Sequence, residues 1–480
     1  MPKEILVNVA PQEKRVAIVN EGRLEEFYIE RPQDKNIVGN IYKGRIDTVV
    51  PSLNAAFVDL ALERKGFLYL SDIEDTIEPV ERHGHSKHLE VKKDDEVLVQ
   101  VVKEPFGTKG PRISTHIGLA GRYFVLTPQN AHHGISRRIE DDAERKRLRQ
   151  ILEALKLPAD LGFIVRTEAR GKSKAQLQQD ALFLIKLWHR IEKAAEKAKA
   201  PSLVYEEYDL VLRVIRDSFT EEVHRLIVDS LAEYHRTRRF IYSFLGHMVR
   251  KVEFYKESDL FAKKGVENQI NRIFESKVYL KSKAYLVIEP TEGLVVIDVN
   301  SGGFKKGTDP EEAAFKVNNE AAVEAARQLR LRDLGGIIII DFIDMEREHH
   351  RRQIFNTLNH ELSKDRAKYD VLGISKFGVV EMTRERIHRS AAMLSYQECP
   401  YCQGKGKVKS PLTVSIDAWR QLEELLAGGH HKSVTMAVNP LVHQELLKDT
   451  FNFKALERKF KANIAILSNP AFHLEDIKIS

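Results

Sequence analysis

The sequence of 480 residues contains only two cysteines, Cys399 and Cys402. This scarcity excludes the disulfide-stapled framework typical of small secreted domains and favours a reducing compartment. There is also no apolar run long enough to cross a bilayer, no apolar signal core near the N-terminus and no tandem repeat. We therefore expect a cytoplasmic protein without a transmembrane segment, with about three or more domains.

The net charge of +6 is mild for 76 basic and 70 acidic residues, but basic side chains gather in short clusters. Such clusters could face a polyanion, or they could be solvated helix faces, because acidic residues alternate with many of them. Both interpretations stay open for each single cluster. The clusters are Lys109–Arg112, Arg137–Arg138, Lys146–Arg149, Arg236–Arg239 and His349–Arg352.

The order of apolar patterns predicts a multidomain α/β protein. Residues 4–30 alternate as strands, and residues 36–114 contain five short strands separated by turns, which is the rhythm of a small oligonucleotide-binding barrel. Residues 116–210 mix strands with helices, whereas residues 219–275 are highly charged and read as helical. A compact strand–helix–strand unit follows at 284–345, and residues 411–480 form a last α/β piece.

Two aspartates end neighbouring apolar runs within this strand–helix–strand unit. LVVIDVN carries Asp298, IIIIDFID carries Asp341, and a helix capped by Asp309 lies between them. A right-handed crossover makes the two strands parallel and adjacent, so both carboxylates emerge at one end of the sheet. Adjacent carboxylates repel unless a cation separates them, and oxygen ligands favour Mg²⁺ or Mn²⁺. Asn300 adds an amide that could orient a phosphate or a metal-bound water.

The alternative for this pair is that both aspartates only cap the loops that follow their strands, which is common. The pairing on adjacent strands, with Asn300 close by, favours a functional site over this alternative. Asp344 lies three residues after Asp341 and could interact with the groups that bind the cation without binding it itself. No phosphate-binding loop, zinc-protease helix or nucleophile triad can be read from the sequence, and the His-rich stretch 83–88 reads as a solvated loop.

The cysteines lie in the segment ECPYCQGKG, at a spacing typical of metal ligands. A structural zinc ion takes four ligands, and no other Cys or His pair stands beside these two. Two chains that each contribute Cys399 and Cys402 would complete the site. A redox pair and two unligated thiols remain as alternatives, although Gly404 and Gly406 favour a turn over the helix that usually follows a redox motif.

Several of these motifs, in this order, resemble the ribonuclease E/G family. The resemblance is dense over residues 1–410 and looser beyond them. Because the sequence ends near residue 480 without a long polar tail, it resembles the short members of that family. The segments that carry the resemblance are VGNIYKGRI, AAFVDL, GISRRIE, IVRT, IDVNSGG, RQLRLRDLGGIIIIDFIDM, GVVEMTRERI and ECPYCQGKG.

The resemblance implies an RNase H-like subdomain interrupted by an S1 (OB-type) barrel and a 5′-end sensor, followed by a DNase I-like catalytic subdomain. A zinc-link and a small C-terminal α/β domain complete the architecture. The implied boundaries are 1–35 plus 212–275 for the RNase H-like part, 36–115 for the barrel, 116–211 for the sensor, 276–397 for the catalytic part, 398–409 for the link and 410–480 for the last domain.

The resemblance also assigns site residues. It implies that Asp298 and Asp341 hold a catalytic Mg²⁺ and that Asn300 belongs to the same site. It implies a zinc ion shared between protomers, in dimers that pair into tetramers. The base-contacting and phosphate-contacting residues of the barrel would be Phe57, Phe67 and Lys109, and those of the sensor Val125, Arg166 and Thr167.

Two of these assignments have a physical counterpart in the residues. An aromatic ring exposed in a barrel groove stacks on any base, although an isolated Phe in a strand is more often part of the core. A guanidinium and a hydroxyl suit a terminal phosphate. Glu168 departs from the family pattern, in which a small residue follows the threonine, and an inward-pointing acid would weaken a phosphate pocket.

The sequence therefore predicts an Mg²⁺-dependent endoribonuclease that cleaves single-stranded RNA. The resemblance implies roles in rRNA maturation and mRNA turnover and a preference for 5′-monophosphorylated ends. A non-catalytic S1-domain RNA-binding or scaffold protein is the alternative from another class, and a DNA endonuclease is a second one. The aspartate pair separates the first alternative from an enzyme, because a binding module has no need of two carboxylates beside a polyanion.

Overall fold

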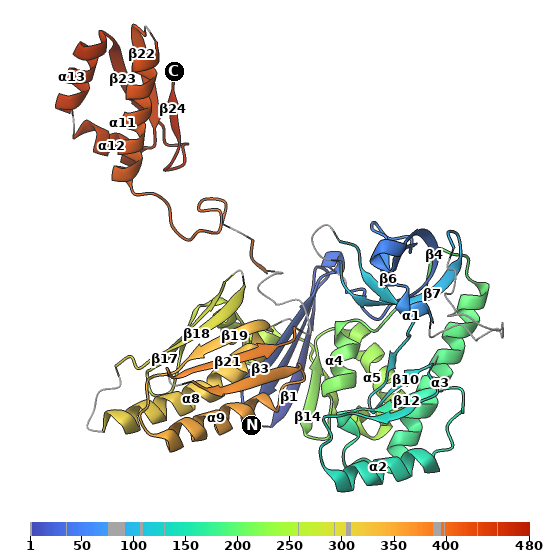
Figure 1. The fold of residues 1–480 in the computed structure, drawn as a ribbon. Coiled ribbons are helices and arrows are strands. Elements are labelled where there is room, and N and C mark those ends of the chain that lie inside the picture. Colours follow the sequence, from blue (N-terminus) through green and yellow to red (C-terminus); the bar gives the residue numbers. More distant parts are fainter. Residues whose placement is uncertain are drawn as a thin grey trace. The chain divides into compact units, whose positions relative to one another are not determined.

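The computed structural model describes residues 2–34, 36–74, 92–105, 109–128, 130–257, 259–291, 293–303, 309–375, 377–386, 395–397, 399–429, 431–448 and 450–480. The His-rich stretch 83–88 lies outside them. The chain divides into two compact units, Met1–Leu394 and Ser395–Ser480 (Figure 1). Among the described residues, no helix combines the length and the apolar character needed to span a membrane.

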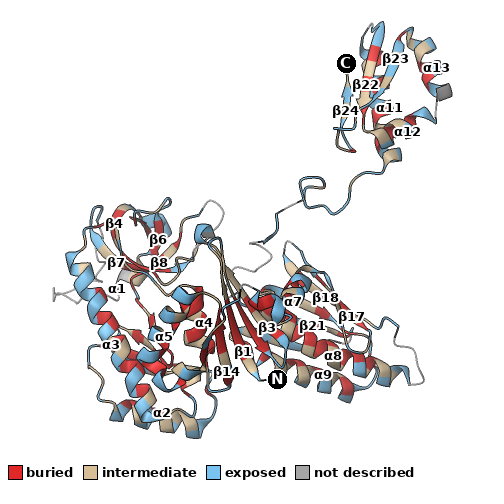
Figure 2. Ribbon diagram, turned by 180° about the vertical axis from the view of Figure 1, so that it is seen from behind, coloured by how far each residue is buried: buried red, intermediate tan, exposed pale blue. Residues whose placement is uncertain are grey.

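The first sheet of the large unit combines strands from residues 3–30 with strands from residues 223–254. Its strand order is β15 (Val252–Phe254), β14 (Val223–Val228), β1 (Lys3–Val9), β2 (Lys14–Asn20) and β3 (Arg23–Glu30). β1 pairs in parallel with β14, and helices cover both faces of the sheet, so the middles of its central strands β1 and β2 are buried (Figure 2). The covering helices are α4 (Leu210–Ser218), α5 (Leu231–Leu245), α6 (Leu260–Lys263) and α7 (Glu267–Asn271).

The expectation that residues 219–275 are wholly helical is wrong, because β14 and β15 lie within them. β14 has the sequence VHRLIV, in which the polar and accessible His224 and Arg225 interrupt the buried apolar residues. Its pairing partner β1 lies at the other end of the sequence, so no neighbouring strand or hairpin turn marks it locally. The parallel pairing with β1 therefore decides the conformation of this segment.

Six strands form the barrel that follows β3. The five strands expected within residues 36–114 are confirmed as β4 (Ile41–Val50), β5 (Ala55–Asp59), β6 (Gly66–Tyr69), β7 (Glu96–Lys103) and β8 (Arg112–Ser114). β4 pairs with both β5 and β7, which closes the sheet on itself. A sixth strand, β13 (Ser202–Tyr205), arrives from a distant part of the chain and pairs with β4.

A four-stranded sheet and two helices lie between β8 and β13. The apolar runs GRYFVLTP and GFIVRTEA form β10 (Phe124–Thr127) and β12 (Gly162–Val165), as expected, with β9 (Leu119–Ala120) and β11 (His133–Ile135) beside them. The two expected helices are α2 (Asp142–Ala154) and α3 (Lys174–Lys197). Asp180 of α3 is buried and accepts the backbone N–H groups of residues 122–124, which fixes the helix against the sheet.

A second six-stranded sheet completes the large unit. Its order is β16 (Lys277–Tyr279), β17 (Tyr285–Pro290), β18 (Leu294–Asn300), β19 (Gly336–Asp341), β21 (Val379–Arg384) and β20 (Tyr369–Ile374). Helices α8 (Pro310–Leu331) and α9 (Glu348–Leu362) pack on one face of it. Asp309 caps α8 and Pro310 opens it, as the sequence predicts. In Figure 1 both helices lie on the same side of the strands.

The small unit contains a three-stranded sheet with three helices. The strand order is β23 (Asn463–Ser468), β22 (Ser433–Val438) and β24 (Ile477–Ile479). The helices are α11 (Pro411–Gly428), α12 (Pro440–Leu447) and α13 (Thr450–Phe460). β22 and β23 are the two strands that the sequence marks most clearly, and they pair in parallel.

Candidate functional site

The two aspartates predicted to act together are direct neighbours across two strands. β18 and β19 run parallel, and their register pairs Asp298 with Asp341. The intervening helix α8 packs on both strands, so the predicted strand–helix–strand crossover is confirmed. Because parallel strands present their carboxyl ends at the same end of a sheet, the crossover brings the two carboxyl groups together.

Side-chain alternation decides which face of the sheet carries the pair. Ile297, Val299 and Ile340 are buried in the core beneath α8 and α9. Asp298 and Asp341 alternate with them and therefore point to the opposite face. No helix of the described core covers that face: Asp298 is half-buried and Asp341 is exposed. The pair is therefore open to a large ligand such as a nucleic acid strand.

An amide orients the carboxylate of Asp298, and neighbouring negative charges perturb the carboxylate of Asp341. Asn300 Nδ2 donates to Asp298 Oδ2 at 2.7 Å, which fixes the orientation of that carboxylate. Partial burial raises the pKa of Asp341, and the negative charges of Asp298 and Asp344 raise it further. The local field is thus strongly negative, which is the condition under which a divalent cation binds best.

The segment that follows β19 and contains Asp344 is fastened by two residues that the sequence did not reveal. Asn318 of α8 is fully buried; its Nδ2 donates to Ile343 O at 2.7 Å, and its Oδ1 accepts from Ile343 N at 3.0 Å. Glu311 accepts the backbone N–H groups of Glu346 and Arg347. The bond from Glu346 is the main reason that the pKa of Glu311 is lowered to about 2. A polar residue at core-facing spacing was the only sequence signal for Asn318.

Gly302 allows the chain to leave β18 close to the neighbouring loop. Its φ of +57° lies in the left-handed region, and a Cβ placed on it would lie 2.6 Å from Lys283 O. Any other residue would push the segment away from that carbonyl group. The glycine therefore helps to fix the path of the chain directly after Asp298 and Asn300.

The aromatic residues predicted for the barrel lie on its outer face, not in its core. Phe57 and Phe67 pair across β5 and β6, with ring centroids 5.8 Å apart. Ala56, Val58 and Leu68 alternate with them and fill the barrel interior. The alternative that Phe57 and Phe67 belong to the core is therefore excluded, because the pleat turns both rings outward.

Two further residues extend this aromatic surface, and sequence reasoning did not single them out. Tyr69 lies two residues after Phe67 on the same face of β6, and the two ring centroids are 5.0 Å apart. The guanidinium carbon of Arg112 lies 4.8 Å from the centroid of the Tyr69 ring. We call Phe57, Phe67, Tyr69 and Arg112 the aromatic strip. The alternation of Phe67 and Tyr69 with Leu68 in the segment GFLY was the sequence signal that could have placed Tyr69 beside Phe67.

Lys109 is exposed at the entry to β8, beside the strip. The following Gly110 passes so close to Lys65 that a Cβ would lie 2.0 Å from the Lys65 carbonyl oxygen. Phe67 N donates to Pro111 O at 2.8 Å, which ties this segment to β6. These two contacts hold the backbone that follows Lys109 against β6, the strand that carries Phe67 and Tyr69.

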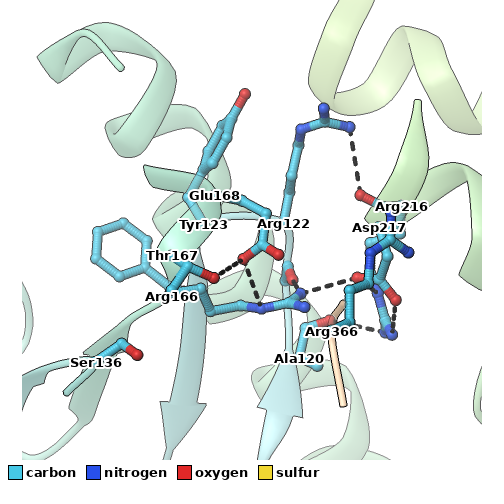
Figure 3. Close-up of polar contacts among 12 residues, drawn as sticks. Ala120, Arg122, Tyr123, Ser136, Arg166, Thr167, Glu168, Arg216, Asp217 and Arg366 are labelled. Carbon is cyan, nitrogen blue, oxygen red and sulfur yellow. Dashed lines mark hydrogen bonds and ion pairs between the residues drawn. The ribbon is translucent and has the colours of Figure 1, made fainter. Parts of the chain in front are cut away.

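The residues predicted for the 5′-end sensor lie on β10 and at the end of the adjacent strand β12. Val125 of β10 pairs with Ile164, and Arg166 lies two residues further along the same face. Arg166 and Thr167 are half-buried and follow the strand directly. Figure 3 shows their side chains converging with those of neighbouring acidic residues.

Both polar groups of this pocket already have acidic partners. Arg166 Nη1 donates to Asp217 Oδ1 at 3.0 Å, and Arg166 Nε lies 3.6 Å from Glu168 Oε2. Thr167 Oγ1 donates to Glu168 Oε2 at 3.1 Å. Glu168, at which the sequence departs from the family pattern, therefore points toward Arg166 and Thr167 (Figure 3).

The pocket opens on a cavity of about 820 Å³ whose wall is mainly basic. Eleven basic and five acidic residues line it, among them Arg166, Asp217 and Arg366. Burial opposes the ionised form of Asp217, but the charges of Arg216 and Arg166 outweigh burial and hold its pKa well below the usual range. Burial likewise opposes the charge of Arg366, and nearby acidic groups including Asp217 and Glu168 raise its pKa nonetheless. The excess of positive charge suits an anionic ligand.

Three family models cover most of the sequence. A model of the Ribonuclease E/G family matches residues 118–387, an S1 RNA binding domain model matches residues 35–115, and a model of the RNase E/G thioredoxin-like domain matches residues 398–480. The chain belongs to the ribonuclease E/G family. The resemblance predicted from the motifs is confirmed, and the architecture is a multidomain α/β arrangement with an S1 barrel and a small thioredoxin-like domain.

Individual relatives support this assignment over most of the chain. Ribonuclease G of Escherichia coli (strain K12) is 42% identical over 429 residues, which cover 88% of this chain and 88% of the relative. Ribonuclease G of Haemophilus influenzae is 39% identical over 454 residues, covering 93% and 92%. Ribonuclease E of Escherichia coli (strain K12) is 42% identical over 430 residues, but these cover only 40% of its length.

The donor set at the aspartate pair of this ribonuclease E/G family member fits a hard divalent cation. Two carboxylates and one amide oxygen are available, and Mg²⁺ commonly binds one or two carboxylates and keeps several waters. In the part of the chain that the structure describes, no group of three or more His, Cys, Asp or Glu residues forms a more complete cage. A site of this kind leaves coordination positions for phosphate oxygens.

The two cysteines form a turn that packs on the small unit. Gly406 N donates to Cys402 Sγ at 3.3 Å, and backbone bonds from residues 401 and 402 lower the pKa of Cys399. His473, the nearest histidine, uses both ring nitrogens: Nε2 donates to Tyr401 O at 2.6 Å, and Nδ1 accepts from Glu475 N at 3.1 Å. The turn therefore offers two sulfur ligands and no histidine.

The pKa of Asp341 provides a direct probe of the aspartate pair. Replacing Asp298 with asparagine removes one of the negative charges that raise this pKa, so the pKa should fall toward the ordinary value for aspartate. Carboxyl ¹³C NMR titration of the protein with labelled aspartate measures the change. The same substitution at Asp370, an exposed residue of β20 in the same sheet, is the matched control. An unchanged pKa in Asp298→Asn would contradict the proximity of the two groups.

Proposed function

We propose that this chain is a divalent-metal-dependent endoribonuclease that cleaves single-stranded RNA. The observation that carries the proposal is the register pairing of Asp298 with Asp341 on the open face of a sheet, in a chain that also contains an S1 barrel. Membership of the ribonuclease E/G family, with relatives named ribonuclease G and ribonuclease E, supports the same activity. We expect it to act in the cytoplasm, in rRNA maturation and mRNA turnover.

Asp298 and Asp341 would hold Mg²⁺, or Mn²⁺ in its place. When bound, the cation would supply Lewis-acid assistance to water attack on the phosphodiester and would neutralise developing negative charge. Asn300 keeps the Asp298 carboxylate in one orientation through its 2.7 Å hydrogen bond, and its own oxygen remains available to the ligand. Asp344 adds negative charge that strengthens cation binding. The uncovered face of the sheet leaves room for the RNA backbone.

The aromatic strip would hold the bases of the substrate. Phe57, Phe67 and Tyr69 offer ring faces and edges on the outside of the barrel, where bases can stack without sequence preference. Arg112 and Lys109 bring positive charge for the phosphates to the same region. This combination of rings and cations is typical of single-strand binding by small barrels.

The sensor pocket of Val125, Arg166 and Thr167 would receive the 5′ end of the RNA. A guanidinium and a hydroxyl at the end of one strand match the acceptor oxygens of a terminal monophosphate. The basic cavity beside the pocket supports the passage of a polyanion. The RNase H-like, sensor and DNase I-like subdivision of the large unit stays part of this proposal, with the boundaries given above.

Cys399 and Cys402 would bind one zinc ion together with the same two residues of a second chain. Four thiolates complete a structural zinc site, and His473 is not available to complete it within one chain. The hydrogen bond from Gly406 N to Cys402 Sγ holds the turn around that sulfur. The resulting homodimer could pair again into a tetramer, as the family resemblance implies.

A non-catalytic RNA-binding or scaffold protein is not favoured. The S1 barrel and the basic cavity would be enough for such a role, but the two adjacent carboxylates would then repel the RNA they lie beside. A cation between them removes that conflict, and a bound cation next to a phosphodiester is the arrangement of a metal-dependent nuclease.

Catalysis should depend on both members of the pair. Asp298→Asn or Asp341→Asn should lower cleavage of a fluorescent single-stranded RNA about a thousandfold or more, because the cation contributes several kcal/mol to the transition state. Affinity for the RNA should change little. Asp370→Asn is the matched control and should cleave at the wild-type rate, and a chelator should stop cleavage by the wild type. A variant of either aspartate within tenfold of wild type would contradict the assignment.

Loss of the aromatic strip should weaken RNA binding without unfolding the barrel. Phe67→Ala or Tyr69→Ala should raise the Kd for a single-stranded oligonucleotide about five- to a hundredfold, since each stacked base contributes about 1–3 kcal/mol. Fluorescence anisotropy with the non-cleaving Asp298→Asn protein measures this. Tyr242→Ala, which removes an exposed ring from α5, is the control. Equal Kd values for these variants and the control would exclude the strip as the RNA contact.

Zinc should hold two chains together. Native mass spectrometry should find one zinc ion per two chains in the wild type, whereas Cys402→Ser should be monomeric and free of zinc. Lys405→Ser changes an exposed neighbour on the same turn and should behave as the wild type. A zinc-bound monomer, or a dimer that persists in Cys402→Ser without zinc, would contradict the shared site.

A further inference from the structure

The sensor pocket contains an acid supplied by the chain itself, at the place where a terminal phosphate would bind. Thr167 Oγ1 donates to Glu168 Oε2 at 3.1 Å, and Arg166 Nε lies 3.6 Å from the same oxygen. The other side of the guanidinium is used by Asp217 Oδ1, 3.0 Å from Nη1, and by the Gly121 carbonyl group. Every polar group proposed to receive the phosphate therefore already has a partner (Figure 3).

The backbone directs Glu168 into this place. Arg166 N donates to Tyr123 O at 2.8 Å, which anchors the end of β12 to its neighbour. The chain then turns through a short 3-10 helix at Thr167–Ala169, and Ala169 N donates back to Arg166 O at 3.1 Å. This tight turn brings the Glu168 side chain next to the Arg166 side chain.

The two acids in the pocket differ in how firmly they are held. Asp217 forms a bidentate pair with Arg216 at 3.2 and 3.0 Å, in addition to its bond with Arg166. Glu168 has only one hydroxyl donor and one ion pair at 3.6 Å, although the two side chains are similarly exposed, 24% for Glu168 and 20% for Asp217. Asp217 is therefore a fixed part of the pocket, whereas Glu168 can turn out toward solvent.

We infer that Glu168 is a specificity-determining residue, an internal carboxylate that competes with the 5′ phosphate of RNA for Arg166 and Thr167. This inference rests on the proposed function, because it needs an endoribonuclease that reads the 5′ end. A phosphate can enter only if Glu168 leaves, since two anions on the same donors repel. The chain therefore discriminates weakly between 5′-monophosphate and 5′-hydroxyl ends.

The expected loss in phosphate affinity follows from the contacts with Arg166 and Thr167 that Glu168 must break when the phosphate binds. A partly exposed ion pair and one hydroxyl hydrogen bond together correspond to about a five- to tenfold loss in phosphate affinity. The departing carboxylate stays in solvent nearby, so its residual repulsion acts in the same direction. Removing the carboxylate should recover the lost phosphate affinity, and selectivity for the 5′-monophosphate should rise by the same factor.

The test compares one oligonucleotide bearing a 5′-monophosphate or a 5′-hydroxyl group. The ratio of kcat/KM for the two ends should be close to one in the wild type and about five- to tenfold higher in Glu168→Ala. Glu168→Gln, which keeps the size and removes the charge, should raise the ratio as well. Glu192→Ala, an exposed acid on α3, should leave the ratio unchanged. Adding Thr167→Val to Glu168→Ala should lower the gain, because the phosphate then loses a donor.

Binding provides a readout that does not need cleavage. In an Asp298→Asn background, Glu168→Ala should lower the Kd for the 5′-monophosphorylated oligonucleotide relative to the 5′-hydroxyl form by the same factor. An unchanged ratio of Kd values and of kcat/KM values in Glu168→Ala overturns the inference, while cleavage by the wild type leaves the endoribonuclease standing. Absence of metal-dependent cleavage of either oligonucleotide by the wild type overturns the proposed function itself.

Discussion

The parallel pairing of β18 with β19 is the constraint on which the candidate active site depends. The crossover through α8 sets the register at Asp298 and Asp341, and the buried isoleucines that alternate with them turn both carboxyl groups to the uncovered face. The negative charges of Asp298 and Asp344 help to raise the pKa of Asp341. Hydrophobic packing of the sheet therefore holds an acid next to other negative charges, the setting in which the proposed cation would be stabilising.

Inward-facing and outward-facing side chains also alternate along the strands of the barrel, where the outward-facing residues are aromatic instead of acidic. Its inner residues form a closed apolar core, and this core holds the aromatic strip in place on the outside without any contribution from the rings themselves. The aromatic strip and the apolar core therefore lie on opposite faces of the same strands. The residues of the outer face can change while the barrel remains intact.

The sensor pocket shows how charge is balanced when many arginines are partly buried. Arg166, Arg216 and Arg366 come from three separate segments of the large unit and share Asp217 as a partner or neighbour. Buried cations need such partners, so Arg166 and Arg216 are each paired with an acid of the protein. Under the proposed function, an anionic ligand would replace one of these acids, and Glu168 has fewer hydrogen-bond partners than Asp217.

The sequence by itself determined the features that depend on local pattern: the five barrel strands, the capped helix α8 and the aspartate pair, because a strand–helix–strand crossover has only one favoured hand. It did not reveal β14 or β13, whose pairing partners lie far away in the chain. It also left open whether Phe57 faced inward, and it missed Asn318, Tyr69 and Arg112. Only the tertiary structure decided these points, because pairing partners, exposed faces and the direction of Glu168 depend on contacts between segments that are distant in sequence.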